Sequence, residues 1–271
     1  EFRRVLFRSL NLQPGGDRMN IHAEIEADPL QPVAILDRPQ ARYLPAHRQF
    51  QGIPGIQITA SGRLWASWYS GGTDEGPENY VVLATSDDNG KSWTDPVAVI
   101  DPPGNVRAYD PVLWCDPSGR MWWFWSQSFS PENLKIHDGR AGVWACYTDD
   151  PNRACPKFSA PVRIANGVMM NKPTVLSTGE WALPTAVWDY FPEKIPELAH
   201  ERFSNMLVSH DQGQTFSIRG CADVPQRCCD EHTIVELRDG RLWMLVRTMY
   251  GIGQSYSEDR GRTWSPGEDS G

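Results

Sequence analysis

Short runs of alternating apolar and polar residues recur along the chain at intervals of about sixty residues. Each run follows a turn that contains glycine, and a tryptophan stands two or three residues after that glycine. In the four copies the stretch from glycine to tryptophan covers residues 62–65, 119–122, 179–181 and 240–243. The runs that follow read ASWYS, WFWSQ, ALPTAVW and MLVRT. The glycines are 57, 60 and 61 residues apart. Alternation with a period of two predicts half-buried strands, and the glycine turns predict hairpins.

A second pattern, Ser-x-Asp-x-Gly-x-x-Trp/Phe, follows these runs and keeps step with them. Full copies begin at Ser86, Ser209 and Ser257, and a degenerate copy begins at Thr148 and resumes at Phe158. The four starts are 62, 61 and 48 residues apart. Within each copy the aspartate can accept hydrogen bonds from its own turn, and the glycine can take the left-handed conformation. We therefore interpret the box aspartates as structural turn residues: Asp88, Asp211 and Asp259.

Repeats of this length, each with several short strands, predict an all-β protein with the architecture of a β-propeller. The composition agrees, because 12 Trp among 271 residues exclude a disordered chain. Half of these tryptophans fall on two repeat positions: Trp65, Trp122, Trp181 and Trp243 in the strands, and Trp93 and Trp264 in the boxes. A net charge of −8 argues against a nucleic-acid partner or an anionic membrane surface, and no apolar run is long enough for a transmembrane helix.

The boxes are Asp-boxes, and from about Gln49 onward the chain resembles the sialidase (neuraminidase) superfamily, especially its bacterial Asp-box (BNR repeat) proteins. The resemblance implies a six-bladed propeller, which needs about 360 residues. We therefore expect residues 49–271 to be a C-terminally truncated, inactive fragment of about four blades. Residues 1–18 are expected to be a non-native leader, and residues 19–48 are expected to lead into the propeller.

The resemblance also implies roles for two residues in the stretch DEHTIVELRDGRLWMLVR. Glu231 corresponds to the glutamate that activates a tyrosine nucleophile, and Arg247, 16 residues later, to an arginine that binds the substrate carboxylate. Asp230 and His232 flank this glutamate and are candidates for the cleft wall. The tyrosine itself and a third arginine are expected outside the chain.

The proton donor of the family is an acid in the loop before the first Asp-box. Here that loop reads GGTDEGPENY, and spacing does not choose among its three acids, Asp74, Glu75 and Glu78. Clustered carboxyl groups are one way to raise the pKa of a donor. Polar loop residues kept at the surface for solubility are the alternative interpretation.

The sequence departs from the family at the first arginine, where an Arg-Ile-Pro motif becomes Gly52-Ile53-Pro54. Arg107, in VRAYDP, is the better candidate to replace that arginine, and Arg48 is a weaker one. Asp110 is expected either to orient Arg107 or to face the substrate.

Further candidates for substrate contacts come from the third repeat. Asn171 and Lys172 could contact sugar hydroxyls or a carboxylate, although a turn before a strand explains them equally well. Trp188 and Tyr190 could stack on a sugar ring, although aromatics at strand ends more often pack within a blade.

Three functional hypotheses remain open from the sequence. The first is an exo-acting glycoside hydrolase that removes a terminal acidic sugar, such as sialic acid, from a glycan. The second is a non-catalytic Asp-box propeller that binds carbohydrate or protein, since a fold does not fix a function. The third is a glycosidase for another sugar, with its site built around Asp110, Lys172 and His232.

The remaining signals are negative or weak. No metal or cofactor motif is present, so neither is implied. Six cysteines without zinc-site spacing are best interpreted as free thiols, and adjacency disfavours a disulfide between Cys228 and Cys229. The sequence as written carries no signal peptide and indicates a cytoplasmic protein, with a periplasmic or secreted one as the alternative if a natural N-terminus is missing.

Overall fold

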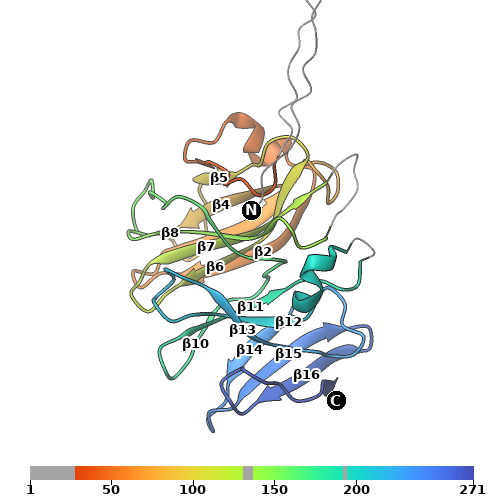
Figure 1. The fold of residues 1–271 in the computed structure, drawn as a ribbon. Helices are drawn as coiled ribbons and strands as arrows, with labels where there is room; N and C mark the ends of the chain where they lie inside the picture. Colours follow the sequence, from red (N-terminus) through yellow and green to blue (C-terminus); the bar gives the residue numbers. More distant parts are fainter. Residues whose placement is uncertain (1–27, 131–136, 192–193) are drawn as a thin grey trace, which may run out of the picture.

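Four antiparallel sheets follow one another along the chain, from the orange sheet to the blue one in Figure 1. The computed structural model describes residues 28–130, 137–191 and 194–271, so the expected leader at 1–18 and the first part of the 19–48 segment lie outside the described residues. Each sheet is one blade, and the all-β fold with four blades of a propeller confirms the architecture predicted from the repeats.

Blades 1 and 2 are built from consecutive hairpins. Blade 1 contains β2 (Gln51–Ile58), β3 (Leu64–Ser70), β4 (Tyr80–Ser86) and β5 (Ala98–Ile100). The short β1 (Ile35–Leu36) pairs with β5, so the N-terminal segment adds a fifth strand to this blade. Blade 2 contains β6 (Val106–Cys115), β7 (Met121–Phe129), β8 (Gly142–Thr148) and β9 (Val162–Ala165).

Blades 3 and 4 repeat this order. Blade 3 contains β10 (Thr174–Val175), β11 (Trp181–Ala186), β12 (Ser204–Ser209) and β13 (Ser217–Ala222). Blade 4 contains β14 (Thr233–Glu236), β15 (Leu242–Thr248), β16 (Gly251–Ser257) and β17 (Glu268–Asp269). Short 3-10 helices lie outside the sheets: η1 (Ala41–Tyr43), η2 (Pro45–His47) and η4 (Pro196–Glu201).

Each full Asp-box closes the turn between the last two strands of its blade with the same hydrogen bonds. In blade 4, Ser257 Oγ donates to Asp259 Oδ1 at 2.9 Å and accepts from the Gly261 amide at 2.7 Å. Asp259 also accepts from the Thr263 amide at 2.9 Å and from the Thr263 hydroxyl at 2.6 Å. Blades 1 and 3 repeat these contacts within a few tenths of an ångström. The box aspartates are therefore turn residues, as predicted.

Blades 1 and 2, and blades 2 and 3, meet where the strand tryptophan of the first packs against the box of the second. The centres of the Trp122 and Trp181 rings are 5.6 Å apart in an edge-to-face arrangement, and both rings pack closely against Gly213 in the box of blade 3. Arg120, next to Trp122 in its hairpin, donates to the Gln212 carbonyl of the same box at 2.7 Å. Between blades 1 and 2, the Trp65 indole likewise donates to the Pro151 carbonyl at 3.1 Å.

The recurring tryptophans differ in burial according to their neighbours. Trp65, Trp122 and Trp181 are at most 2% exposed, whereas Trp243 in blade 4 is only half-buried. In the boxes, Trp264 packs against the core shared by blades 3 and 4, but Trp93 leaves 41% of its surface exposed. The strand position therefore contributes more to the core than the box position does.

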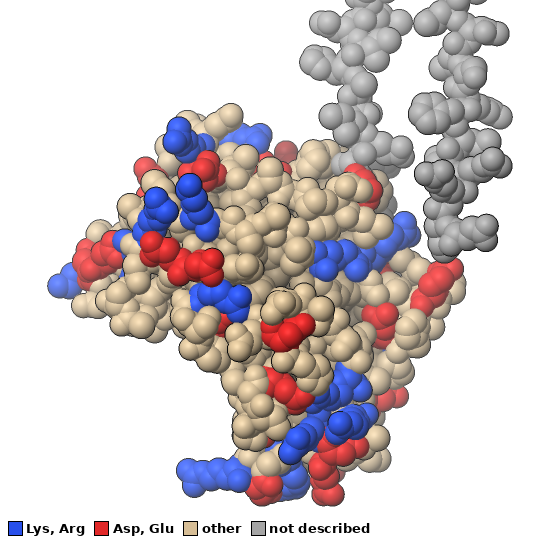
Figure 2. Space-filling view, turned by 60° about the vertical axis from the view of Figure 1, so that its left-hand side comes forward, with Lys and Arg blue, Asp and Glu red and all other residues tan. Residues whose placement is uncertain are grey.

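Charged side chains of both signs are interspersed over the face shown in Figure 2, without a continuous basic tract. Among the described residues, no helix combines the length and the apolar character needed to cross a bilayer.

The contact at Gly213 predicts a specific sensitivity to an added methyl group. In Gly213→Ala the new Cβ would lie 2.5 Å from Trp122 Cζ2, whereas in Gly240→Ala it would meet nothing within 4 Å. Both glycines have φ of 87°, so both variants lose about 1–2 kcal/mol to the left-handed backbone. We expect Gly213→Ala to lose about 1–3 kcal/mol more through overpacking, measured by urea unfolding. Equal losses in the two variants would contradict the interblade contact.

The boxes also predict how stability depends on pH. Hydrogen bonds from Thr263, first its hydroxyl and then its amide, lower the pKa of Asp259 from 3.8 to about 2. The carboxylate therefore stabilises the fold fully above pH 4 and loses this contribution as the pH falls towards 2. We expect the melting temperature of Asp259→Asn to lie below that of the parent at pH 5 and the gap to shrink towards pH 2. The exposed Asp149 of the degenerate box provides the comparison, since Asp149→Asn removes the same charge from a box without the full serine–aspartate–glycine pattern.

Candidate functional site

Two inner strands carry matching β-bulges that aim side chains into a central cavity. In β2 the register shifts between Gly52 and Gly55, and in β6 it shifts between Tyr109 and Val112. Each bulge holds a left-handed residue followed by proline, with φ of 44° at Ile53 and 48° at Asp110. Bulges redirect side chains and are common beside active sites. Both Ile53 and Asp110 line the cavity.

The central cavity has a volume of about 210 Å³ and is lined by residues from all four blades. It brings together five of the residues singled out in the sequence, namely Glu75, Arg107, Asp110, Glu231 and Arg247. Three carboxyl groups and two guanidinium groups therefore share one small space. Its remaining lining is mainly aromatic and apolar: Ile53, Tyr69, Tyr109, His137, Met170, Trp188, Phe191 and Cys229.

Arg107 is buried in the cavity wall with unmet hydrogen-bonding capacity. The residue is 1% exposed, and its guanidinium lies 4.1 Å from the centre of the Tyr109 ring. Among the described residues, Nε and Nη1 of Arg107 have no hydrogen-bond partner. Buried donors normally find partners, and leaving one unpaired costs about 1–3 kcal/mol. A buried guanidinium in a cavity wall, with hydrogen-bonding capacity left over, is suited to bind an anion.

Asp110 is a buried acid of the cavity with a strongly raised pKa. Burial raises its pKa from 3.8 to about 7, the positive charge of Arg107 opposes this rise, and the negative charges of Glu75 and Glu231 add to it. The residue is only 5% exposed. Near neutral pH its carboxyl group therefore holds a proton in a large fraction of molecules, which is the property required of a general acid.

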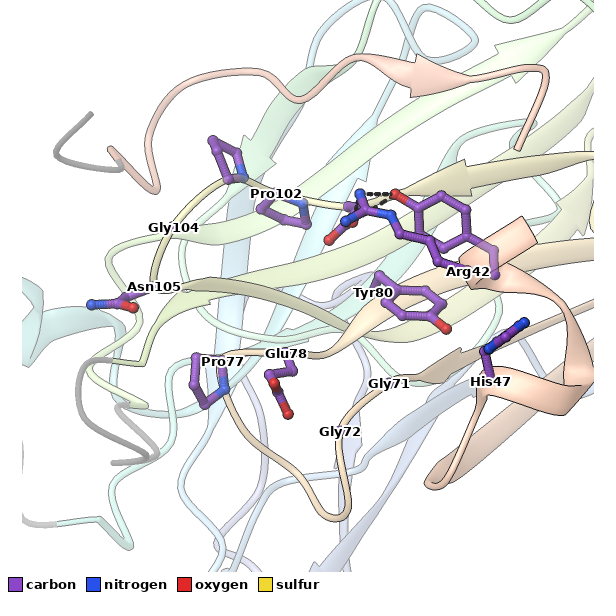
Figure 3. A pocket seen from close by; sticks show the side chains of 13 residues that line it. Arg42, His47, Gly71, Gly72, Pro77, Glu78, Tyr80, Pro102, Gly104 and Asn105 are labelled. Carbon is purple, nitrogen blue, oxygen red and sulfur yellow. Dashed lines mark hydrogen bonds and ion pairs between the residues drawn. The ribbon is translucent and has the colours of Figure 1, made fainter. Parts of the chain in front are cut away.

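The structure separates the three acids of the loop at 74–78. Glu75 lines the central cavity and accepts a hydrogen bond of 2.7 Å from the Tyr69 hydroxyl. Asp74 caps the Glu75 amide at 2.7 Å and does not line the cavity. Glu78 lines a different cavity of about 630 Å³ beside η1, together with Tyr80 and Gly72 (Figure 3). Glu75 is thus the acid of this loop that reaches the candidate site.

Tyr69 explains the departure from the family at Gly52. A Cβ on Gly52 would lie 3.0 Å from Tyr69 Cζ and 3.2 Å from Phe50 Cζ. The tyrosine therefore occupies the space into which an arginine at this position would extend. Arg48 does not compensate, because it lies over the Trp68 ring at 5.2 Å and is not part of the cavity lining.

Glu231 and Arg247 form an ion pair of 2.5 Å at the rim of the cavity. The pair is partly exposed, and the hydrogen bond from Arg247 to Glu231 raises the pKa of the arginine. Asn171 donates to the carbonyl oxygens of Glu231 and His232 at 3.1 and 3.0 Å. Asn171 therefore positions the backbone that carries Glu231 and is not part of the cavity lining.

Several candidates lie elsewhere. Lys172 donates to the Ile56 carbonyl at 2.7 Å and to Gln57 Oε1 at 2.6 Å, and so ties blade 3 to β2. His232 is buried between the carbonyl oxygens of Asp230 and Asn205. The carboxyl group of Asp230 is also buried, 3.0 Å from Arg227, and burial raises its pKa to about 6. Tyr190 is 55% exposed and lies outside the cavity lining, whereas Trp188 is part of it.

The sequence reasoning missed Tyr69 and His137. The ring of His137 stacks near Phe191 at 4.5 Å and near Trp188 at 5.0 Å, so these three rings form one aromatic wall. Tyr69 ends a predicted strand of alternating residues, so its inward direction could have been inferred from that period. His137 stands in a loop, where no periodic signal exists. Among the described residues, no cluster of His, Cys, Asp and Glu is arranged to hold a metal ion.

Comparison with known proteins places this chain in a family. The sequence profile of the BNR repeat-like domain matches residues 62–270, and the chain therefore belongs to that family. A comparison with curated proteins gave no match.

Solved structures with the same fold include several sialidases. A Hadza microbial sialidase aligns with a TM-score of 0.61 and 18% identity over 80% of this chain and 46% of its own. A mutant of NanB sialidase from Streptococcus pneumoniae aligns with a TM-score of 0.59 and 15% identity over 89% of this chain and 54% of its own. A Dyadobacter fermentans protein of unknown function aligns with a TM-score of 0.62 and 17% identity over 88% of this chain and 72% of its own. The chain thus has a sialidase-type propeller fold and spans about half the length of these two sialidases.

The raised pKa of Asp110 predicts a pH-dependent gain in stability on neutralising this residue. An unfolded aspartate ionises near pH 3.8, whereas Asp110 ionises at about 7, so its burial costs stability increasingly between these values. We expect the melting temperature of Asp110→Asn minus that of the parent to rise from pH 4 to pH 7 and then to level off. A difference independent of pH would contradict the assignment.

Proposed function

We propose that this chain forms part of an exo-acting glycoside hydrolase that recognises a terminal sugar bearing a carboxylate, such as sialic acid or a uronic acid. The observation that carries this proposal is the buried Arg107, whose Nε and Nη1 lack partners among the described residues. A substrate carboxylate would accept a hydrogen bond from one of these two nitrogens together with Nη2, because each bidentate edge of a planar guanidinium contains Nη2. The sialidase-type fold supports the same class of substrate.

The surrounding groups suit acid-assisted cleavage of a glycosidic bond. Hydrolysis needs a proton donor for the leaving oxygen and negative charge near the anomeric carbon in its oxocarbenium-like transition state. Asp110, with a pKa of about 7, and Glu75, from the loop that supplies the donor in the resembling family, are the two candidates for the donor. Glu231 also lines the cavity, and the aromatic wall of Trp188 and Phe191 offers a face for the sugar ring.

A non-catalytic propeller that binds acidic glycans is the second candidate. Glu231 and Arg247 neutralise each other at 2.5 Å, and Gly52 stands where the resembling family has an arginine. Such a protein would keep the Arg107 contact with a carboxylate and would not cleave the glycan.

Binding of free sugars tests the recognition that both candidates share. We expect sialic acid or glucuronic acid to bind this chain in calorimetry and their methyl esters to bind at least about tenfold more weakly, because a charged hydrogen bond contributes about 1.5–3 kcal/mol. Arg107→Gln should weaken binding of the acids by a similar factor. Arg48→Gln provides the matched control, since Arg48 lies outside the cavity lining, and should bind like the parent.

Equal binding of acids and esters, or unchanged binding by a folded Arg107→Gln, would contradict carboxylate recognition. Release of a chromophore from aryl glycosides of the bound acid, measured with a longer chain that carries the complete propeller, then separates the two candidates. Turnover that Asp110→Asn or Glu75→Gln abolishes supports the hydrolase and identifies its donor. Binding without turnover supports the non-catalytic propeller.

A further inference from the structure

Two adjacent thiols lie at the central cavity, and Cys229 is part of its wall. Cys228 and Cys229 precede β14, both are free, and their Sγ atoms are 3.7 Å apart. The sequence disfavoured a bond between them because they are neighbours in the chain. The structure nevertheless places the two sulfur atoms in van der Waals contact, and bond formation would bring them from 3.7 Å to about 2.0 Å.

The backbone holds this pair in place beside Glu231 and Arg247. The Cys228 amide donates to the Arg247 carbonyl at 3.1 Å, which fixes the segment to the end of β15. Cys229 has φ of 54°, in the left-handed region, and its side chain lines the cavity. Glu231 follows two residues later. A covalent change at the pair would therefore alter the cavity wall next to the candidate catalytic group.

We propose that Cys228 and Cys229 are a redox modification site that closes to a vicinal disulfide when a hydroperoxide acts on it. One thiol, as its thiolate, attacks the peroxide oxygen, which gives a sulfenic acid and releases water from hydrogen peroxide. The second sulfur then attacks the sulfenic sulfur, the S–O bond breaks and a second water leaves. Overall, two thiols and one hydrogen peroxide give one disulfide and two waters.

The closed form is reversible for a geometric reason. Adjacent Cα atoms are about 3.8 Å apart, whereas disulfides usually join Cα atoms about 4.4–6.8 Å apart. Strain of this kind raises the reduction potential and makes a disulfide easier to reduce. A mild dithiol should therefore restore the thiols without unfolding the protein.

The surroundings also predict the rate of oxidation. Burial first, and then the contact with Cys228, raise the pKa of Cys229 to about 12. A thiol with a high pKa is rarely ionised at neutral pH and reacts slowly. Cys155, which is exposed, serves as the reference in a parallel treatment of the parent chain and should be modified sooner.

Mass spectrometry of one peptide tests the proposal directly. Trypsin cleaves after Arg227 and Arg238, and the peptide 228–238 contains both thiols and no other cysteine. After peroxide treatment of the folded chain in the Cys155→Ser background, blocking of free thiols and digestion without reductant, we expect this peptide unalkylated and lighter by two hydrogen atoms. Dithiothreitol before blocking should return the doubly alkylated form.

Controls separate the disulfide from other oxidation products. In Cys228→Ser the same treatment should give no loss of two hydrogens and should leave Cys229 alkylated or carrying added oxygen. Recovery of the parent peptide as doubly alkylated, as a sulfinic acid or joined to another cysteine peptide would overturn the proposal. The readout needs no ligand or turnover, so it is independent of the proposed function.

Discussion

The fold depends on close packing between the tryptophan of one blade and the Asp-box of the next. Trp122 reaches Gly213 so closely that no side chain fits there, and Arg120 fixes the same turn through the Gln212 carbonyl. Blade 1 uses the same arrangement, since Arg63 donates to the Arg153 carbonyl at 2.8 Å in the corresponding turn of blade 2. A period of about sixty residues thus determines how one blade stacks on another. This stacking brings residues from four sheets to one cavity.

The sequence predicted the fold well because the information that specifies a blade is local. The box needs a serine, an aspartate and a glycine at fixed spacing, and the structure shows the hydrogen bonds that this spacing implies. One member was missed: the hydroxyl of Ser92, Thr215 or Thr263 completes each box. The pattern Ser-x-Asp-x-Gly-x-x-Trp/Phe leaves the residue before the aromatic unspecified.

The candidate site was predictable only in part, because its geometry depends on contacts between blades. Glu231 and Arg247 came from a motif within one hairpin, and the structure places them in contact. Lys172 was a candidate for substrate contacts, with a turn before a strand as the equal alternative. Its ammonium group donates to the backbone of β2, which lies two blades away and is invisible to local reasoning. The direction of Asp110 depends on a bulge, and a bulge reverses the face on which the following side chains stand.

The two bulges have different capacities for change during evolution. Aspartate and asparagine tolerate the left-handed conformation better than most residues, so position 110 can exchange a carboxyl for an amide without rebuilding its strand. A β-branched residue in that conformation is an outlier, and Ile53 occupies it at the other bulge. Replacement of Ile53 by glycine or asparagine would therefore relieve the backbone strain at this position. Homologues should vary more freely at Ile53 than at Asp110, where conformation and charge restrict the choice together.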